Sequence, residues 1–147
     1  MSGNEEPSGP GVGDDGADMP GFTGYKWTVE AISYDGTATP VPAQYSVYLQ
    51  FTPDGHFAAK EPVNFHSGSY TLAPGGFRTG KLAKTMKGYA GSDPVVLLAQ
   101  KAIGALGNHS RAHATLRGDT LTVTVNGYTL IAQRAGAQAN RPAPRGT

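Results

Sequence analysis

Four histidines are the residues of this chain whose types and spacing most readily suggest metal binding. His109 and His113 are four positions apart, and His56 and His66 lie on neighbouring segments. Residues four apart on a strand share a face but lie about 13 Å from each other, and one zinc ion needs ligands within about 2 Å. Gly107 argues against a helix that would bring His109 and His113 together. We therefore interpret the four as surface histidines and predict no metal site and no other cofactor.

A serine-hydrolase triad could be written from Ser67, His66 and Asp93. The residues around Ser67 do not form the Gly-x-Ser-x-Gly elbow that exposes a nucleophile. Asp93 is followed by Pro94, and this pair is better explained as the start of a helix. We therefore predict no catalytic residue and expect that the protein is not an enzyme.

Arg78, Lys81, Lys84 and Lys87 form a basic run that could bind an acidic polymer or lipid headgroups. On an extended chain these side chains would divide between two faces, which weakens a single anion site. The alternative is a set of solubilising charges that protects a sheet edge. The net charge of the whole chain is +1, so we expect no nucleic-acid partner.

Strand signals dominate the segments that would position these side chains. Polar and apolar residues alternate in several short segments. Pro53-Asp54-Gly55 and Asn126-Gly127 are hairpin signals between such segments, because glycine accepts a positive φ. The strands expected from these patterns are 26–32, 45–51, 56–60, 69–72, 77–84, 111–116, 121–125 and 128–134.

One helix is expected, from an Asp93 N-cap and Pro94 to a left-handed Gly107. Apolar residues at helical spacing give it a broad apolar stripe. Gly104 lies inside this helix, where glycine costs about 1 kcal/mol relative to alanine, so we expect close packing there.

These elements predict a mainly β fold, a small antiparallel β-barrel or strongly curled sheet with one α-helix covering an end or face. Alternation places Trp27, Tyr45, Phe51 and Tyr70 in the core, with Ala31 on the Trp27 side and Tyr48 exposed.

The two ends of the chain differ from its middle in composition. Residues 1–23 are rich in Gly, Pro, Ser and acid, and residues 135–147 have no apolar period, so both are expected to be disordered. The domain is then 24–134. The start of the chain resembles the tether that follows the lipid-bearing cysteine of bacterial lipoproteins, which suggests that Met1 replaces an export segment. The chain contains no cysteine, which excludes disulfides.

Short motifs in a fixed order resemble the META domain, the family of HslJ-like bacterial lipoproteins. The matching positions are Trp27 in the first strand, the Asp54-Gly55 turn, Asn64 with Gly68 and Tyr70, Thr85-Met86, and Leu121 with Leu130. Most of these positions are expected to be structural. The resemblance implies an extracytoplasmic, envelope-associated, mainly β protein without an established enzyme activity.

Family members often carry two cysteines that this chain lacks. Val63 stands just before the asparagine, and Lys87 or Gly88 follows the methionine. A role that depends on a disulfide bridge is therefore not carried over by the resemblance.

We expect a non-enzymatic binding or interaction module, either a cell-surface lipoprotein or secreted. Its partner is unknown, and the candidate partners are an envelope protein or an acidic polymer. Contact with a membrane is expected only through a lipid anchor that is absent from this chain. The alternative is a lipocalin-like carrier of a small apolar ligand. A cavity of about 300 Å³ in the barrel would favour the carrier, whereas a core filled by Trp27, Phe51, Leu98 and Ile103 would favour the interaction module.

Overall fold

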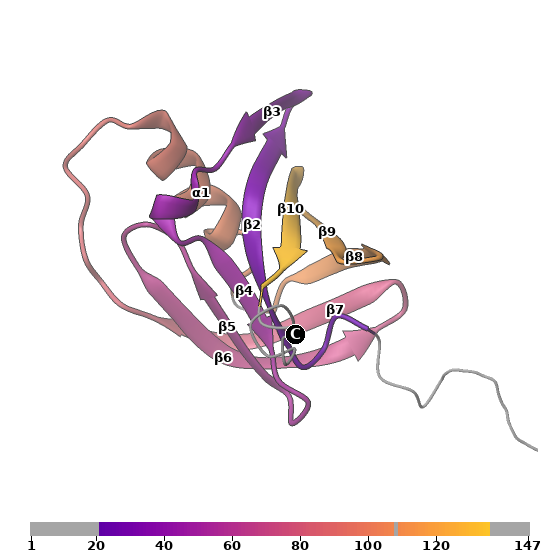
Figure 1. The fold of residues 1–147 in the computed structure, drawn as a ribbon. Coiled ribbons are helices and arrows are strands. Elements are labelled where there is room, and N and C mark those ends of the chain that lie inside the picture. Colours follow the sequence, from indigo (N-terminus) through magenta and orange to yellow (C-terminus); the bar gives the residue numbers. More distant parts are fainter. Residues whose placement is uncertain (1–20, 108, 136–147) are drawn as a thin grey trace, which may run out of the picture.

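Nine antiparallel strands and one α-helix make up the part of the chain that the computed structural model describes, residues 21–107 and 109–135 (Figure 1). The strands are β2 (Tyr25–Tyr34), β3 (Thr37–Pro40), β4 (Tyr48–Phe51), β5 (His56–Lys60), β6 (Phe65–Ala73), β7 (Gly76–Lys84), β8 (Arg111–Arg117), β9 (Thr120–Val125) and β10 (Tyr128–Arg134). The helix is α1 (Pro94–Gly104), and a short 3-10 helix, η1 (Ala43–Tyr45), precedes β4.

Eight of these strands close into a barrel. Each strand from β4 to β10 pairs with the next, β2 pairs with β4, and β10 returns to pair with β2. The far half of β2, Ala31 to Tyr34, also pairs with β3, which lies outside the barrel. The predicted fold class, a small antiparallel barrel with one helix, is confirmed.

Both hairpin turns expected from glycine have the backbone geometry that requires it. Gly55 has φ 93°, and Asn126 and Gly127 have φ 47° and 85°. A positive φ at both central residues matches the right-handed twist of the flanking strands. These turns set the register of β4 with β5 and of β9 with β10.

Aromatic side chains fill the middle of the barrel. Trp27, Phe51, Phe57 and Phe77 are all 1% exposed or less. The Phe51 ring lies with its centroid 4.9 Å from that of Phe77 and 5.3 Å from that of Phe57. The Phe51–Phe77 pair is edge-to-face, with an interplanar angle of 72°, and such pairs stabilise a core beyond the area that they bury.

Two irregularities change the sides predicted from alternation. Ala132 pairs with Val29 and Ile131 pairs with Ala31, so Glu30 is an extra residue in β2. This bulge turns Ile32 into the core, fully buried, and leaves Ala31 only half-buried, which corrects the prediction for Ala31.

The predicted strand 45–51 is also shorter than expected. Ser46 has φ 53°, a left-handed conformation that interrupts an extended chain, so Tyr45 belongs to η1 and β4 begins at Tyr48. Tyr45 is half-buried rather than a core residue. Tyr48 is half-buried rather than exposed, with the Lys26 ammonium 4.2 Å from its ring centroid.

Helix α1 begins as predicted and ends differently. The Asp93 carboxylate accepts a hydrogen bond from the Val95 amide (2.9 Å), and Pro94 opens the helix. Val96, Ala99, Ala102 and Ile103 form its buried side. Helix α1 ends at Gly104, and its C-cap is Ala105 in a right-handed conformation with φ −65°. Gly107 lies beyond the cap and does not adopt the predicted left-handed conformation. A Cβ at Gly104 would meet nothing within 4 Å, so the predicted close packing there is wrong.

The folded unit begins before the predicted boundary at Gly24. Phe22 is 4% exposed, its ring lies 5.0 Å from that of Phe51, and its carbonyl accepts a hydrogen bond from the Trp27 indole (2.8 Å). The predicted tether at 1–23 is therefore wrong at Phe22 and Thr23. Residues 1–20 of that tether and the tail from 136 onward lie outside the described residues. In the described ranges, no helix is long and apolar enough to cross a lipid bilayer.

Candidate functional site

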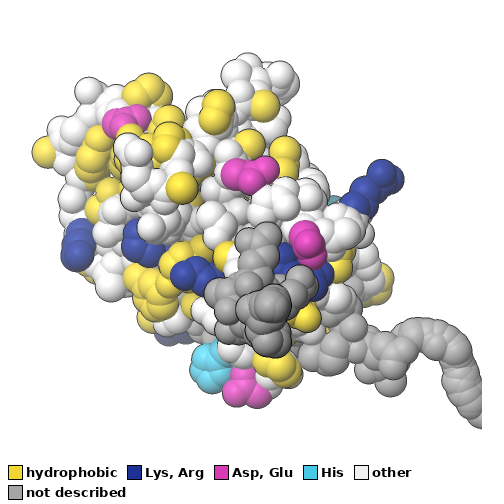
Figure 2. Space-filling model, in the orientation of Figure 1, with side chains coloured by type: hydrophobic (Ala, Val, Ile, Leu, Met, Phe, Trp, Pro, Cys, Tyr) yellow, Lys and Arg dark blue, Asp and Glu magenta, His cyan; other side chains and the backbone are white. Residues whose placement is uncertain are grey.

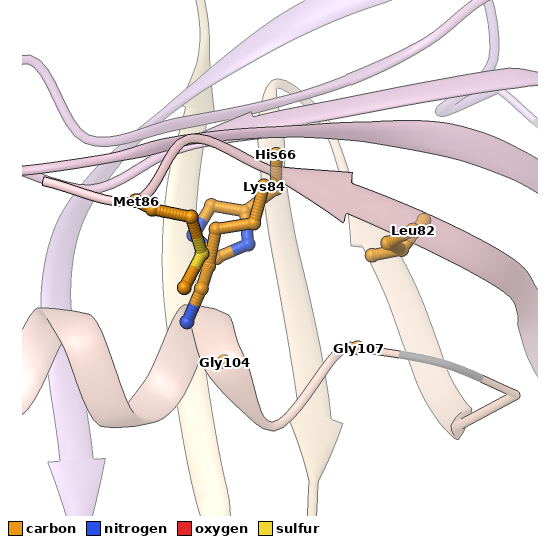
Figure 3. Close-up of a pocket in the computed structure, with 6 residues that line it drawn as sticks. All are labelled: His66, Leu82, Lys84, Met86, Gly104 and Gly107. Carbon is orange, nitrogen blue, oxygen red and sulfur yellow. The ribbon is translucent and has the colours of Figure 1, made fainter.

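A pocket of about 280 Å³ lies between the C-terminal end of α1 and strands β6 and β7 (Figure 3). The strand side provides His66, Leu82, Lys84 and Met86, and the helix side provides Gly104 and Gly107. The pocket therefore lies beside the packed core and not inside the barrel.

A register shift in the β6–β7 hairpin brings Leu82 and Lys84 to this place. Phe77 and Thr79 are buried, which follows simple alternation along β7. The pairing with β6 then shifts between Gly68 and Tyr70, and Leu82 instead of Lys81 becomes half-buried against the core. Lys84 follows Leu82 at the strand period, and its side chain runs toward α1 beside Met86 (Figure 3).

His66 comes from β6 and is buried, with an exposed fraction of 4%. Its Nε2 lies 3.3 Å from Oε2 of Glu61, a carboxylate that is itself 2% exposed. The other Glu61 oxygen accepts hydrogen bonds from the amides of Val63 (2.8 Å) and Asn64 (2.9 Å). Since the carboxylate acts as an acceptor throughout, His66 donates its Nε2 proton to Glu61.

The second ring nitrogen of His66, Nδ1, has no hydrogen-bond partner among the described residues. Among the described residues, it is not one of the fully enclosed side-chain atoms that lack a partner, and His66 lines the pocket. Buried polar atoms are normally paired. An open Nδ1 on a buried ring is therefore a position for a ligand atom.

Asn64 fixes the segment that carries Met86. Its Oδ1 accepts hydrogen bonds from the Thr85 hydroxyl (2.8 Å) and the Lys87 amide (2.8 Å), and its Nδ2 donates to the Lys87 carbonyl (3.0 Å). The side chain is buried, with 5% exposed. These three bonds hold the chain after β7 against the β5–β6 loop, where Met86 lies at the pocket with 84% of its surface exposed.

The described residues that form the helix wall of the pocket, Gly104 and Gly107, carry no side chain. Gly104 is exposed and has open space where a Cβ would lie. The end of the helix is held to β7 because the Thr79 hydroxyl donates to the Leu106 carbonyl (2.9 Å). The helix wall is therefore held in a fixed position, and the space in front of Gly104 is free.

The predicted basic run does not form one cluster around the pocket. Arg78, Lys81, Lys84 and Lys87 are all exposed, and only Lys84 lines the pocket. Lys84 forms no ion pair with any described residue. On the face that Figure 2 shows, Lys and Arg side chains lie at separate places among apolar and neutral groups.

The triad written from the sequence is not assembled. Asp93 accepts a hydrogen bond from the Tyr45 hydroxyl, and this bond, together with the Val95 amide, lowers the pKa of its carboxyl. His66 is bound to Glu61 instead. No group of three or more His, Asp and Glu side chains in the described ranges could hold one metal ion.

The interpretation of surface histidines holds for three of the four. His56, His109 and His113 are exposed, whereas His66 is buried. The signal that would have found His66 is alternation from the predicted core residue Tyr70 back through Gly68, which leads to the core face, but the prediction of surface histidines did not use it. Glu61 gave no such signal, because it precedes a proline in a loop.

The other motif positions hold the fold together. The Thr52 hydroxyl donates to Asp54 and lowers the pKa of that carboxyl. The Tyr70 hydroxyl donates to the Thr52 carbonyl (2.6 Å), and burial raises its pKa. At Gly68, a side chain would collide with Leu82. These contacts place the β4–β5 turn against β6.

A family model, the META domain, matches residues 20–137 of the chain. The chain belongs to the META domain family. The match confirms the resemblance expected from the short motifs, and it covers the whole barrel and its helix. The lack of cysteine distinguishes this META domain from members that carry the two cysteines.

Solved structures with the same fold are also similar to this META domain. An NMR structure of a protein from Burkholderia xenovorans has a TM-score of 0.59 and 22% identity, over 88% of this chain and 99% of that chain. Another NMR structure has a TM-score of 0.54 and 19% identity, over 75% of this chain and 88% of that chain. At these identities the likeness shows the fold alone. No curated protein matches the chain.

Proposed function

We propose that this META domain is a non-enzymatic binding module that acts outside the cytoplasm, and that the pocket beneath α1 is its binding site. The observation that carries the proposal is that buried His66, whose Nδ1 has no hydrogen-bond partner among the described residues, lines a pocket of about 280 Å³. The described residues leave this atom unpaired and supply a fixed, side-chain-free wall opposite it. An unpaired polar atom opposite an open wall is an arrangement that favours binding of a ligand in the pocket.

The packed barrel favours this proposal over a lipocalin-like carrier. Trp27, Phe51 and Ile103 are fully buried, and Leu98 is half-buried against them. A carrier needs an apolar cavity in the barrel mouth, and here the aromatic rings occupy that space. The pocket beneath α1 is outside it and has both polar and apolar walls.

The lining of the pocket favours binding over catalysis. Among the described residues that line it, His66 and Lys84 are the ionisable ones, and none carries a Ser, Thr or Tyr hydroxyl. Nucleophilic catalysis by a hydroxyl would need such a group within hydrogen-bond reach of the imidazole.

The test is a titration of the protein with small neutral, anionic and cationic probes, followed by NMR at the Met86 methyl and the Gly104 and Gly107 amides. We expect at least one probe class to shift these signals. Gly104→Leu should abolish the shifts without unfolding the protein, because the new side chain enters open space. Gly88→Leu is the control, since Gly88 has equally open space and does not line the pocket. Signals that no probe moves would refute the site.

The location outside the cytoplasm is a separate part of the proposal. It is supported by membership of the META domain family and by the acidic, Gly- and Pro-rich composition of residues 1–23. Fractionation of the native host, with protease added to intact cells, tests it. Recovery of the protein only with cytoplasmic markers would refute it.

A further inference from the structure

We infer that the pocket takes a small ligand with a carboxylate group, held between the His66 imidazole and the Lys84 ammonium, with an apolar body against Met86 and Leu82. The inference rests on the proposed function, because it names the ligand class for the same pocket. It follows from the charges, the hydrogen-bonding capacity and the walls of the site.

The charge of the pocket lining favours an anion. His66 and Lys84 are its ionisable side chains, and Lys84 has no acidic partner among the described residues. An ammonium group that lines a pocket would repel a bound cation. This decides against a soft metal ion, although an imidazole and the Met86 thioether are ligands that such an ion prefers.

Glu61 prepares the imidazole for this role. Its carboxylate lies 3.3 Å from Nε2 and fixes the orientation of a ring that lines the pocket, while Nδ1 has no partner among the described residues. A second proton on Nδ1 would make the ring a cation between two carboxylates, one from Glu61 and one from the ligand. Charge-assisted hydrogen bonds of this kind are about twice as strong as neutral ones. Binding of the carboxylate is therefore coupled to uptake of one proton from the solvent at Nδ1, after which the carboxylate accepts from Nδ1–H and from the Lys84 ammonium.

The remaining walls suit an apolar body of modest size. Leu82 and Met86 present aliphatic and thioether groups, and the two glycines leave room beside them. A volume of about 280 Å³ lies at the small end of ligand pockets. Methionine adapts its shape to different apolar groups. A short aliphatic or aromatic acid fits these features better than a bare inorganic anion.

The experiment compares three probes of equal length, hexanoate, hexanol and hexylamine, in NMR titrations of the full chain at pH 6.5. We expect hexanoate to bind at least tenfold more tightly than the alcohol, and the amine to bind most weakly. The ¹⁵N signals of the His66 ring should move toward the doubly protonated form only with hexanoate. Inorganic phosphate serves as a fourth probe and should bind more weakly than hexanoate.

The variant Lys84→Met should weaken hexanoate binding about tenfold and leave hexanol binding unchanged. Lys81→Met removes an exposed lysine of the same strand that does not line the pocket, so it should have no effect. Equal losses in both variants would overturn the inference.

Two further outcomes separate this inference from the proposed function. If hexanol or phosphate bound more tightly than hexanoate, as measured at the same NMR signals of the pocket, the preference for a carboxylate would be refuted. The proposal that the pocket is a binding site would still stand. If none of the probes moved those signals, both would fail.

Discussion

Asn64 shows how much one amide side chain can organise in this fold. It joins the β5–β6 loop to the segment after β7 through three hydrogen bonds, and it is buried. The Glu61 carboxylate binds its backbone amide. The position of Met86 at the pocket, and of His66 beside Glu61, both depend on this junction.

We predict that Asn64→Ala lowers the free energy of unfolding by about 3 kcal/mol, since it removes three side-chain hydrogen bonds that contribute about 1 kcal/mol each. Urea unfolding followed by the fluorescence of the single tryptophan, the fully buried Trp27, measures this. Thr85→Val removes one of the three bonds and also the acceptor of the Phe65 amide (3.0 Å), so it should cost about 2 kcal/mol. Hydrogen exchange at the Lys87 amide should accelerate in Asn64→Ala; unchanged protection there would contradict the junction.

Gly104 is the residue at which the structure departs most usefully from expectation. Because a Cβ there meets nothing within 4 Å, we predict that Gly104→Ala stabilises the protein by roughly 1 kcal/mol through helix propensity. The midpoint of urea unfolding is the measurement. Gly76→Ala is the contrasting variant and should destabilise the protein strongly, because its Cβ would collide with the backbone of Ala112 and His113. A destabilised Gly104→Ala would contradict the open wall.

Single residues were predictable where one local rule decides them. The Asp54-Gly55 turn follows from the need for a positive φ, and the burial of Trp27 follows from alternation. The Glu61–His66 pair was not predictable, because a loop residue and a strand residue meet only once the loop has its three-dimensional shape. The same holds for Gly104, whose open surroundings depend on where β7 lies.

Between elements, the contact of η1 with α1 ties the start of the helix to the barrel. The Tyr45 hydroxyl donates to the Asp93 carboxylate, which also caps the helix. The bond raises the pKa of Tyr45 and lowers the pKa of Asp93. Both shifts are linked to the stability of the folded state.

We predict that Tyr45→Phe flattens the pH dependence of stability at both ends. With a lowered pKa, Asp93 stabilises the fold above its unfolded value of about 3.9, and this contribution is lost as pH falls through the folded pKa. With a raised pKa, Tyr45 stabilises the fold below about 10, and this is lost as pH rises through the folded pKa. Thermal unfolding between pH 3 and 11 tests it, with Tyr34→Phe as the control on an exposed tyrosine. If the stability of Tyr45→Phe and of Tyr34→Phe changed with pH in the same way, the contribution of the Tyr45–Asp93 hydrogen bond to this pH dependence would be refuted.

Element types were predictable from the sequence, whereas their irregularities were not. Hairpin turns, the helix start and most strands follow from local patterns. The left-handed Ser46 that ends one predicted strand and the extra Glu30 in β2 follow from how neighbouring strands pair. A period-2 pattern in the sequence does not reveal a β-bulge, and for this reason Ala31 was predicted on the core side of β2.

At the scale of the whole molecule, Phe22 sets where the domain must begin. Its ring packs against Phe51 and its carbonyl binds the Trp27 indole. A unit that starts at Gly24 would lack both contacts. The barrel class was predictable from strand number and turn spacing, but this boundary was not, since it depends on one aromatic residue within a Gly- and Pro-rich segment.

We predict that a chain beginning at residue 21 unfolds with the same free energy as the full chain, within about 0.5 kcal/mol. A chain beginning at residue 24 should lose about 3 kcal/mol, because it leaves the space of a buried phenylalanine empty. Phe22→Ala in the full chain is the matched variant and should cost a similar amount. Urea unfolding measures all three, and equal stability of the two shortened chains would refute the boundary.

The pairing of β2 with β10 has a consequence for how the protein is made. Tyr34 lies opposite Tyr128, and Trp27 lies opposite Arg134, so the barrel joins strands from the two ends of the described chain. A contact between such distant segments forms slowly, and β2 leaves the ribosome long before its partner exists. We expect the nascent chain to remain without its native β2–β10 pairing until synthesis is almost complete.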